Sequence, residues 1–223
     1  MKRSHRPYDI FKRVLDVAGS AVLLVILSPV LLAIAILVRM RLGSPVIFKQ
    51  HRPGRDGRLF TIYKFRSMRE LQVRKDAGAA TGAVGAVDTD ADRLTPFGRR
   101  LRATSADELP ELINVFKGDM SFVGPRPLLP EYLERYNAKQ ARRHEVRPGI
   151  TGWAQVNGRN VVSWEERFEM DVWYVDNRSA LLDLRILGMT VAQVFRRSEV
   201  SSATHATMEP FEGTDARRDE ERG

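Results

Sequence analysis

The sequence predicts an α+β fold, in which a mostly helical domain with one small β-hairpin follows an N-terminal apolar helix. Three observations predict it. An uncharged, largely aliphatic run extends from Val17 to Val38, which is about the length of a membrane helix. Two β-like runs come next, and apolar residues at helical spacing occupy much of the remainder. We expect an N-terminal membrane segment over residues 1–42, a main domain over 43–204 and a polar, mobile tail over 205–223.

The composition narrows the classes of partner. The chain has 223 residues, with 36 Lys and Arg against 28 Asp and Glu, a net charge of +8, so anionic lipids, phosphorylated small molecules and nucleic acids are the natural partners. Nucleic acid is disfavoured because no recognition motif or aromatic stacking platform is present. The chain lacks cysteine and has four scattered histidines, which excludes disulfides and thiolate sites and argues against a histidine-built zinc site.

The N-terminal apolar run carries basic residues on both sides, Lys12 and Arg13 before it and Arg39 and Arg41 after it. The positive-inside rule would keep both ends cytoplasmic. Ser28-Pro29 lies in the middle, where proline removes a backbone hydrogen bond and bends a helix. A re-entrant helix and a single span both remain open, since spanning helices tolerate proline. A signal peptide is disfavoured because the run is too long and lacks a small-residue cleavage site.

A β-hairpin is expected next, from Val46–Lys49 and Leu59–Phe65, with turn dipeptides between the two runs. Lys64, near the end of the second run, is placed to reach a phosphate or to be a solvated strand end. The Gly- and Ala-rich stretch Lys75–Asp92 predicts a flexible surface loop, either a lid or an inert insertion.

The segment that follows predicts two helices and a rigid loop. Thr95-Pro96 opens a short basic helix through Arg102, and Ser105–Glu108 matches a capping box at the start of the second helix, which Gly118 can close. The apolar face of that second helix is expected to consist of Leu109, Leu112, Ile113 and Phe116. Prolines on both sides of Arg126 restrict the loop around it.

This segment also holds the candidate site. Asp107 and Glu108 are adjacent carboxylates, and Arg102, Arg126 and Arg159 are the arginines expected to converge on them. Such a group suits a phosphorylated substrate, with a carboxylate available for chemistry or for a divalent metal. The alternative is structural, because acidic residues in a first helical turn favour the helix dipole and complete a capping box.

The C-terminal half is expected to be largely helical. Glu131–Arg143 predicts a polar helix, and the turn-rich stretch Arg147–Trp153 leads to a loop containing Gln155 and Arg159. Trp164–Val175 and Leu181–Phe195 predict two further helices. The last one either lies in a membrane interface or packs on the core as an ordinary amphipathic helix.

Several long motifs, in order, resemble the bacterial sugar transferase family, the monotopic phosphoglycosyl transferases. The resemblance covers about residues 9–212. Within the family, the chain is particularly similar to the small transferases that act on UDP-diacetylbacillosamine. The motifs are Lys12–Asp16, Ser28-Pro29, Lys64–Met68, Asp107–Pro110, Asn114–Pro127, Val146–Arg159 and His205–Phe211.

The resemblance implies an enzyme that moves a sugar-1-phosphate from a UDP-sugar to undecaprenyl phosphate and releases UMP. It implies Asp107 as the nucleophile that forms a phosphosugar-aspartyl intermediate, Glu108 as its catalytic partner, and Mg²⁺ at Asp107. It favours a re-entrant helix broken at Ser28-Pro29, with the site on the cytoplasmic face of the inner membrane. Six residues match family positions expected to bind phosphate or uridine: Lys64, Arg102, Arg126, Arg147, Gln155 and Arg159.

Two other functions are weighed against this one. The first is the same transfer by direct displacement in a ternary complex, without a covalent intermediate. The second is a non-catalytic protein that binds anionic lipid at the membrane surface, whose binding would fade with salt.

Overall fold

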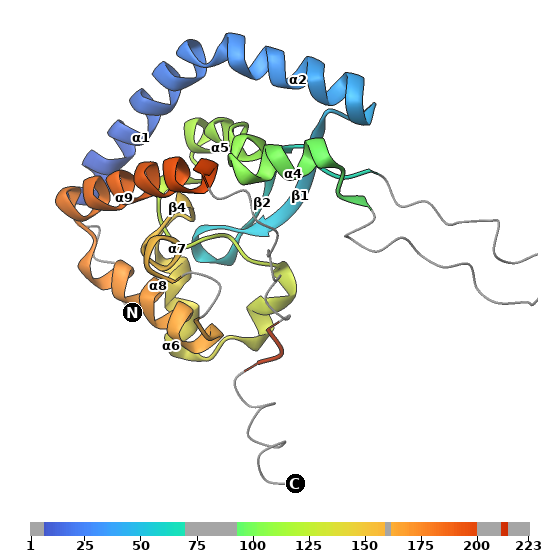
Figure 1. The fold of residues 1–223 in the computed structure, drawn as a ribbon. Coiled ribbons are helices and arrows are strands. Elements are labelled where there is room, and N and C mark those ends of the chain that lie inside the picture. Colours follow the sequence, from blue (N-terminus) through green and yellow to red (C-terminus); the bar gives the residue numbers. More distant parts are fainter. Residues whose placement is uncertain (1–6, 70–92, 159–161, 200–210, 214–223) are drawn as a thin grey trace, which may run out of the picture.

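The computed structural model describes residues 7–69, 93–158, 162–199 and 211–213. Helices α1 (Pro7–Ile26) and α2 (Ser28–Leu42) form an arch above α5 (Glu111–Lys117), and α9 (Ala180–Glu199) begins near the N-terminal end of α1 (Figure 1). The hairpin of β1 (Ile47–Pro53) and β2 (Leu59–Phe65) lies below, and α8 (Trp164–Asn177) is farther from the arch. The expected combination of many helices and one antiparallel hairpin is confirmed.

The predicted break at Ser28-Pro29 is present, and the two helices meet there at 63°. Pro29 has no N–H to donate to the carbonyl of Val25, four residues earlier. The Ser28 hydroxyl donates to that carbonyl instead, at 2.8 Å. Among the described residues, no single helix is long and apolar enough to cross a membrane, and the bent pair of α1 and α2 passes that test only as a pair.

Helix α1 is polar on its buried side and apolar on its exposed side. Asp16 and Ser20 are its buried residues, at 4% and 0% exposure, while Ile10, Val14 and Val25 are 61–74% exposed. A soluble amphipathic helix has the reverse arrangement. An exposed apolar surface of this extent is typical of a helix that contacts lipid or another protein.

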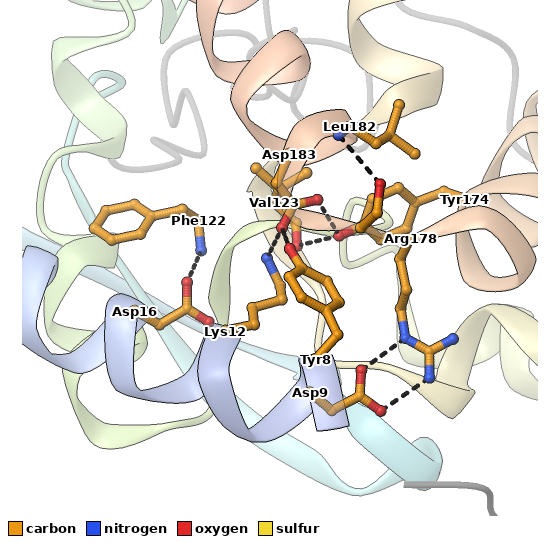
Figure 2. Close-up of polar contacts among 11 residues, drawn as sticks. Tyr8, Asp9, Lys12, Asp16, Phe122, Val123, Tyr174, Arg178, Leu182 and Asp183 are labelled. Atoms are coloured by element: carbon orange, nitrogen blue, oxygen red, sulfur yellow. Dashed lines mark hydrogen bonds and ion pairs between the residues drawn. The ribbon is translucent and has the colours of Figure 1, made fainter. Parts of the chain in front are cut away.

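The polar side of α1 is fastened to the helices at the other end of the chain (Figure 2). Asp183, at the start of α9, accepts hydrogen bonds from Tyr8 at 2.6 Å and from Tyr174 of α8 at 2.8 Å, and it pairs with Lys12. Arg178, between α8 and α9, binds both carboxylate oxygens of Asp9 at 2.8 and 2.9 Å. These contacts fix the direction in which α1 leaves the domain.

The hairpin forms as predicted, with a first strand longer than expected. Ile47 pairs with Phe65 and Pro53 pairs with Leu59 in an antiparallel register. The 3-10 turn η1 (Arg55–Gly57) connects the strands. The hairpin directs the end of β2, with Lys64, toward the start of α5.

The basic helix α4 (Pro96–Ala103) also forms as predicted, with the Thr95 side chain accepting from the Gly98 amide at 3.1 Å. The capping box at Ser105 is wrong. Ser105 has a positive φ of 55° and its side chain makes no capping bond, so Asp107 and Glu108 belong to a separate 3-10 turn, η3 (Ala106–Glu108). Helix α5 starts after Pro110 and ends, as predicted, at Gly118, whose φ is 95°.

The apolar face expected for α5 is only partly correct. Leu112 is buried, but Ile113 and Phe116 are 41% and 47% exposed. The buried side of α5 carries Glu111 and Asn114. The helix is therefore rotated relative to the prediction, with polar residues facing the hairpin.

The two glycine- and proline-rich motifs meet in a second small sheet. Strand β3 (Ser121–Val123) pairs in parallel with β4 (Gly149–Thr151). The backbones approach so closely that a Cβ on Gly149 would lie 2.1 Å from the Gly124 nitrogen. Only glycine permits this contact, which fixes the Pro125-Arg126-Pro127 loop relative to the segment around Arg147.

The single helix predicted over Glu131–Arg143 is wrong. Pro130 directly precedes the segment, and the chain divides into η4 (Pro130–Arg135), α6 (Ala138–Ala141) and η5 (Arg142–Glu145), with a new cap at Asn137. The two later helices are confirmed as α8 and α9, and α7 (Trp153–Asn157) lies before them. On α9, Ile186 is buried while Leu181 and Leu184 are 79% and 66% exposed, so α9 has both a core face and an exposed apolar face.

Three expectations fall wholly or mostly outside the described residues: the Lys75–Asp92 loop, the position of Arg159 and most of the tail after His205. Within that tail, Phe211 is buried and its amide donates to the Tyr132 hydroxyl at 3.0 Å. Phe211 therefore packs on the aromatic cluster of α8 and η4, which differs from the mobile tail that was expected at this position.

Candidate active site

The acidic segment, the hairpin and the proline-flanked loop converge on Glu108. Lys64 at the end of β2 donates to Glu108 Oε1 at 2.6 Å, and Arg126 donates to the same oxygen at 2.8 Å. These three predicted site residues come from separate parts of the chain. The structure thus brings a carboxylate and two phosphate-binding candidates together.

Local backbone geometry sets this arrangement. The left-handed conformation of Ser105 turns the chain after α4, so η3 presents its carboxylates toward β2. A non-glycine residue in that conformation is uncommon and is often found at functional sites. Pro125 and Pro127 restrict the backbone around Arg126, so little freedom remains to be lost when its guanidinium binds an anion.

A third carboxylate, Glu111, belongs to this group and was missed by the sequence analysis. It lies on the buried side of α5 at 3% exposure, and its Oε1 lies 3.0 Å from Lys64 Nζ. Lys64 therefore bridges Glu108 and Glu111. The available signal was the spacing of three acidic residues at 107, 108 and 111, where positions 108 and 111 are three residues apart and are neighbours on a helical surface.

The two bridged carboxylates have opposite electrostatic environments. Burial opposes the charged form of Glu108, but the positive charges of Arg126 and Lys64 prevail and lower its pKa. Burial raises the pKa of Glu111, and Lys64 only partly offsets this effect. Glu108 is consequently the firmly ionised member that holds the two cations in place.

Asp107 differs from both. It is buried to 8% exposure, and none of the described lysines or arginines forms an ion pair with its carboxylate. Burial, with a contribution from the Glu108 charge, raises its pKa, while the fields of Lys64 and Arg102 act in the opposite direction. A buried carboxylate that has no ion-pair partner but lies near cations is a suitable nucleophile toward a phosphorus atom whose negative charges those cations neutralise.

The other predicted site residues are placed differently. Arg102 lies close enough to influence Asp107, and its Nε donates to the Ser67 hydroxyl at 2.9 Å. The Arg147 Nε donates to the Gly118 carbonyl at 2.8 Å, and Gln155 donates to the Ile150 carbonyl at 3.0 Å. Both contacts are to backbone carbonyls, and within the described part of the chain neither Arg147 nor Gln155 forms a hydrogen bond or ion pair with the carboxylates. Arg159 is outside the described residues.

A divalent metal was predicted at Asp107. Within the described ranges, no group of three His, Asp or Glu side chains is arranged to hold a metal ion. Mg²⁺ does not require such a group, because it is often held by one or two carboxylates together with substrate phosphates and water. The Asp107 carboxylate, without an ion-pair partner among the described residues, fits that limited role.

Comparison with known proteins places this geometry in context. The family model described as bacterial sugar transferase matches residues 7–197. A Bacillus subtilis (strain 168) protein named uncharacterized sugar transferase EpsL is 51% identical over 205 residues, covering 92% of this chain and 97% of the relative.

Larger relatives carry more specific names. The undecaprenyl-phosphate galactose phosphotransferase of Salmonella typhimurium is 41% identical over 205 residues, covering 88% of this chain and 42% of the relative. The UDP-glucose:undecaprenyl-phosphate glucose-1-phosphate transferase of Escherichia coli K12 is 39% identical over 194 residues, covering 83% of this chain and 40% of the relative. This chain therefore spans well under half the length of these two relatives.

Proposed function

Because the chain belongs to the bacterial sugar transferase family, we propose that it transfers a sugar-1-phosphate from a UDP-sugar to undecaprenyl phosphate and releases UMP. The names of the Salmonella and Escherichia relatives support this lipid acceptor. The observation that carries the proposal is the buried carboxylate of Asp107, beside a Glu108 held by Lys64 and Arg126.

The proposed chemistry has two displacements at one phosphorus atom. In the first, an Asp107 oxygen bonds to the sugar-proximal phosphorus of the UDP-sugar, the bond from that phosphorus to the bridging oxygen breaks, and UMP leaves. In the second, an oxygen of undecaprenyl phosphate bonds to the same phosphorus, the bond to Asp107 breaks, and the polyprenyl-diphosphate sugar leaves. A covalent intermediate lets a small site serve a soluble donor and a lipid acceptor in turn.

Within this scheme Glu108 organises the site. Because the pKa of Glu108 is lowered by Arg126 and Lys64, it is a weak proton acceptor, so its contacts support a role in aligning the two cations rather than in deprotonating the lipid phosphate. Lys64 and Arg126 then neutralise phosphate charge as Asp107 approaches. Arg102 adds positive charge on the Asp107 side.

We propose that Mg²⁺ binds at Asp107 together with diphosphate oxygens of the donor. When bound, the ion would neutralise phosphate charge and stabilise the leaving UMP. The chain contributes one carboxylate to this site, while Glu108 stays paired with its cations.

The membrane part of the proposal rests on α1 and α2. Their 63° bend and exposed apolar side chains support a helix pair that enters one leaflet and returns to the same face. Basic residues at both ends, Arg13 and Arg39 among them, favour the cytoplasmic face of the inner membrane. Such an anchor would hold the site near the phosphate group of undecaprenyl phosphate.

Trapping the intermediate tests this function. Purified protein incubated with Mg²⁺ and a panel of UDP-sugars labelled in the sugar-proximal phosphate, without lipid, should retain label on Asp107 and release UMP. Asp107→Asn should remove both signals, while Asp119→Asn, which changes a part-exposed acid paired with Lys117, should retain them.

Other outcomes separate the alternatives. Transfer that requires donor and lipid together, with no label on protein, would favour direct displacement in a ternary complex. The exposed apolar side of α1 is equally expected of a non-catalytic lipid-binding protein. That function predicts no UMP from any UDP-sugar and vesicle binding that weakens with salt.

A further inference from the structure

A buried ion pair that the proposed chemistry does not use lies behind the Pro125-Arg126-Pro127 loop. Arg143 of η5 and Asp171 of α8 are 3% and 2% exposed. The Arg143 Nε and Nη2 atoms lie 3.0 and 2.8 Å from the same Asp171 oxygen. The guanidinium also lies 5.7 and 5.8 Å from the ring centres of Tyr136 and Phe168.

Stability alone does not account for such a pair. Removing two charges from water is costly, and replacing a buried pair with apolar side chains is often neutral or stabilising. Burial raises the pKa of Asp171 despite the neighbouring Arg143 charge, whereas for Arg143 burial is outweighed by the contacts with Asp171 and Tyr136, which raise its pKa. The other contacts of Arg143 therefore indicate what the pair does.

The additional contact is the backbone of the candidate site. Arg143 Nη2 donates to the carbonyl oxygen of Arg126 at 2.7 Å. Arg126 in turn donates through its own Nη2 to Glu108 at 2.8 Å. A continuous series of hydrogen bonds thus runs from Asp171 on α8, through Arg143 and Arg126, to the carboxylate turn.

We propose that Arg143 and Asp171 are positioning residues that hold the Arg126 peptide so that its guanidinium is aligned with Glu108 and the incoming phosphate; this role rests on the proposed function. Pro127 excludes helical ψ values for Arg126 but still allows a range of extended ones, so the prolines alone do not fix the direction of the Arg126 carbonyl. The hydrogen bond from Arg143 restrains that direction. Asp171 in turn fixes the direction in which Arg143 presents its donor.

The test replaces the pair without leaving a buried charge. Arg143→Met combined with Asp171→Leu removes both charges and the donor to Arg126, while an apolar pair of similar volume is expected to keep the fold. The matched control makes the same two changes in the neighbouring pair Arg142 and Asp176. That pair joins the same two elements, but its side chains are 32% and 48% exposed.

The first readout is hydrogen exchange in the peptide that spans residues 121–128, and it does not depend on activity. The Arg143/Asp171 variant should exchange about tenfold faster than wild type there because a local restraint is lost. The control variant should match wild type. Unchanged exchange in the Arg143/Asp171 variant would overturn the proposal.

The second readout is a double-mutant cycle on UMP release. The paired replacement should slow release about tenfold in the wild-type background and less than about twofold in an Arg126→Ala background, because residues that act through one another are not additive. Equal losses in both backgrounds would overturn the proposal. If wild-type protein releases no UMP from any UDP-sugar, the proposed function fails, and the exchange measurement still decides whether the pair holds the loop.

Discussion

Replacing Lys64 with methionine tests the electrostatics of the carboxylate group directly. Lys64 is 20% exposed and bridges Glu108 to Glu111. In the variant Glu108 keeps Arg126, whereas Glu111, at 3% exposure, loses its only ion-pair partner among the described residues. Breaking a buried pair typically costs about 3–5 kcal/mol. We expect about 3 kcal/mol here because Lys64 is not fully buried, or a melting temperature lower by roughly 6–12 °C for a chain of this size.

The loss of stability caused by Lys64→Met should depend on pH, and the protonation of Glu111 determines whether it grows or shrinks as pH rises. Burial raises the pKa of Glu111 above its ordinary value, while Lys64 pulls it back. A carboxylate with a raised pKa contributes stability that is full below the ordinary value and is lost as pH rises through the folded-state value. Without Lys64 that pKa rises further, so the deficit of the variant grows with pH and is larger at about pH 8 than at about pH 5.

Thermal unfolding of the detergent-solubilised protein at these two pH values measures both effects. Lys139→Met is the control because Lys139 pairs with Glu169 at 3.0 Å on the surface, where the side chains are 64% and 66% exposed, and such pairs contribute about 1 kcal/mol or less. The reasoning is refuted if Lys64→Met costs no more than Lys139→Met, or if its deficit is larger at the lower pH.

Three further predictions follow from the fold and the proposed site. Ser28→Ala with Pro29→Ala restores an ordinary helical hydrogen bond to the Val25 carbonyl and should move a C-terminal reporter partly to the periplasmic face; a reporter that stays wholly cytoplasmic contradicts a bend set by these residues. Arg13→Met removes the charged donor to the Val115 and Phe116 carbonyls of α5, of which Val115 keeps the Gly118 amide, and should destabilise the protein by about 1–3 kcal/mol in thermal unfolding; an unchanged melting temperature counts against this. Chelation with EDTA should stop UMP release and added Mg²⁺ should restore it; release that persists in EDTA contradicts the metal assignment.

The parts of the fold predicted correctly depend on short-range rules. The hairpin follows from two turn dipeptides between β-like runs, α4 follows from a Thr-Pro cap, and the arch follows from Ser28-Pro29. In each case neighbouring residues determine the conformation. Arg126, one of the three arginines expected to converge on the carboxylates, does contact Glu108, and Lys64, a separate phosphate-binding candidate, joins it there; the roles of these residues stay predictions.

The features that were predicted wrongly or not at all are ones that local sequence patterns do not indicate. Ser105 has the residue type of a helix cap, but its backbone is in the left-handed region and its side chain makes no capping bond. In the sequence, Glu111 has the pattern of an ordinary acidic residue in a first helical turn, and its ion pair with Lys64 forms only because β2 packs against α5. Arg143 and Asp171 are 28 residues apart in sequence, and neither local pattern indicates a buried pair.

Helix α1 links the exposed apolar surface to the geometry of the candidate site. From its polar side, Arg13 donates to the carbonyls of Val115 and Phe116 at the end of α5, at 2.7 and 3.0 Å. Three residues further along, Asp16 accepts from the Phe122 amide at 3.2 Å (Figure 2). Helix α5 follows the carboxylate turn directly, and the strand containing Phe122 leads into the Arg126 loop. The helix that we propose to lie in lipid therefore also holds both halves of the site. Its depth in the bilayer and the alignment of the carboxylates with their cations are for this reason expected to change together.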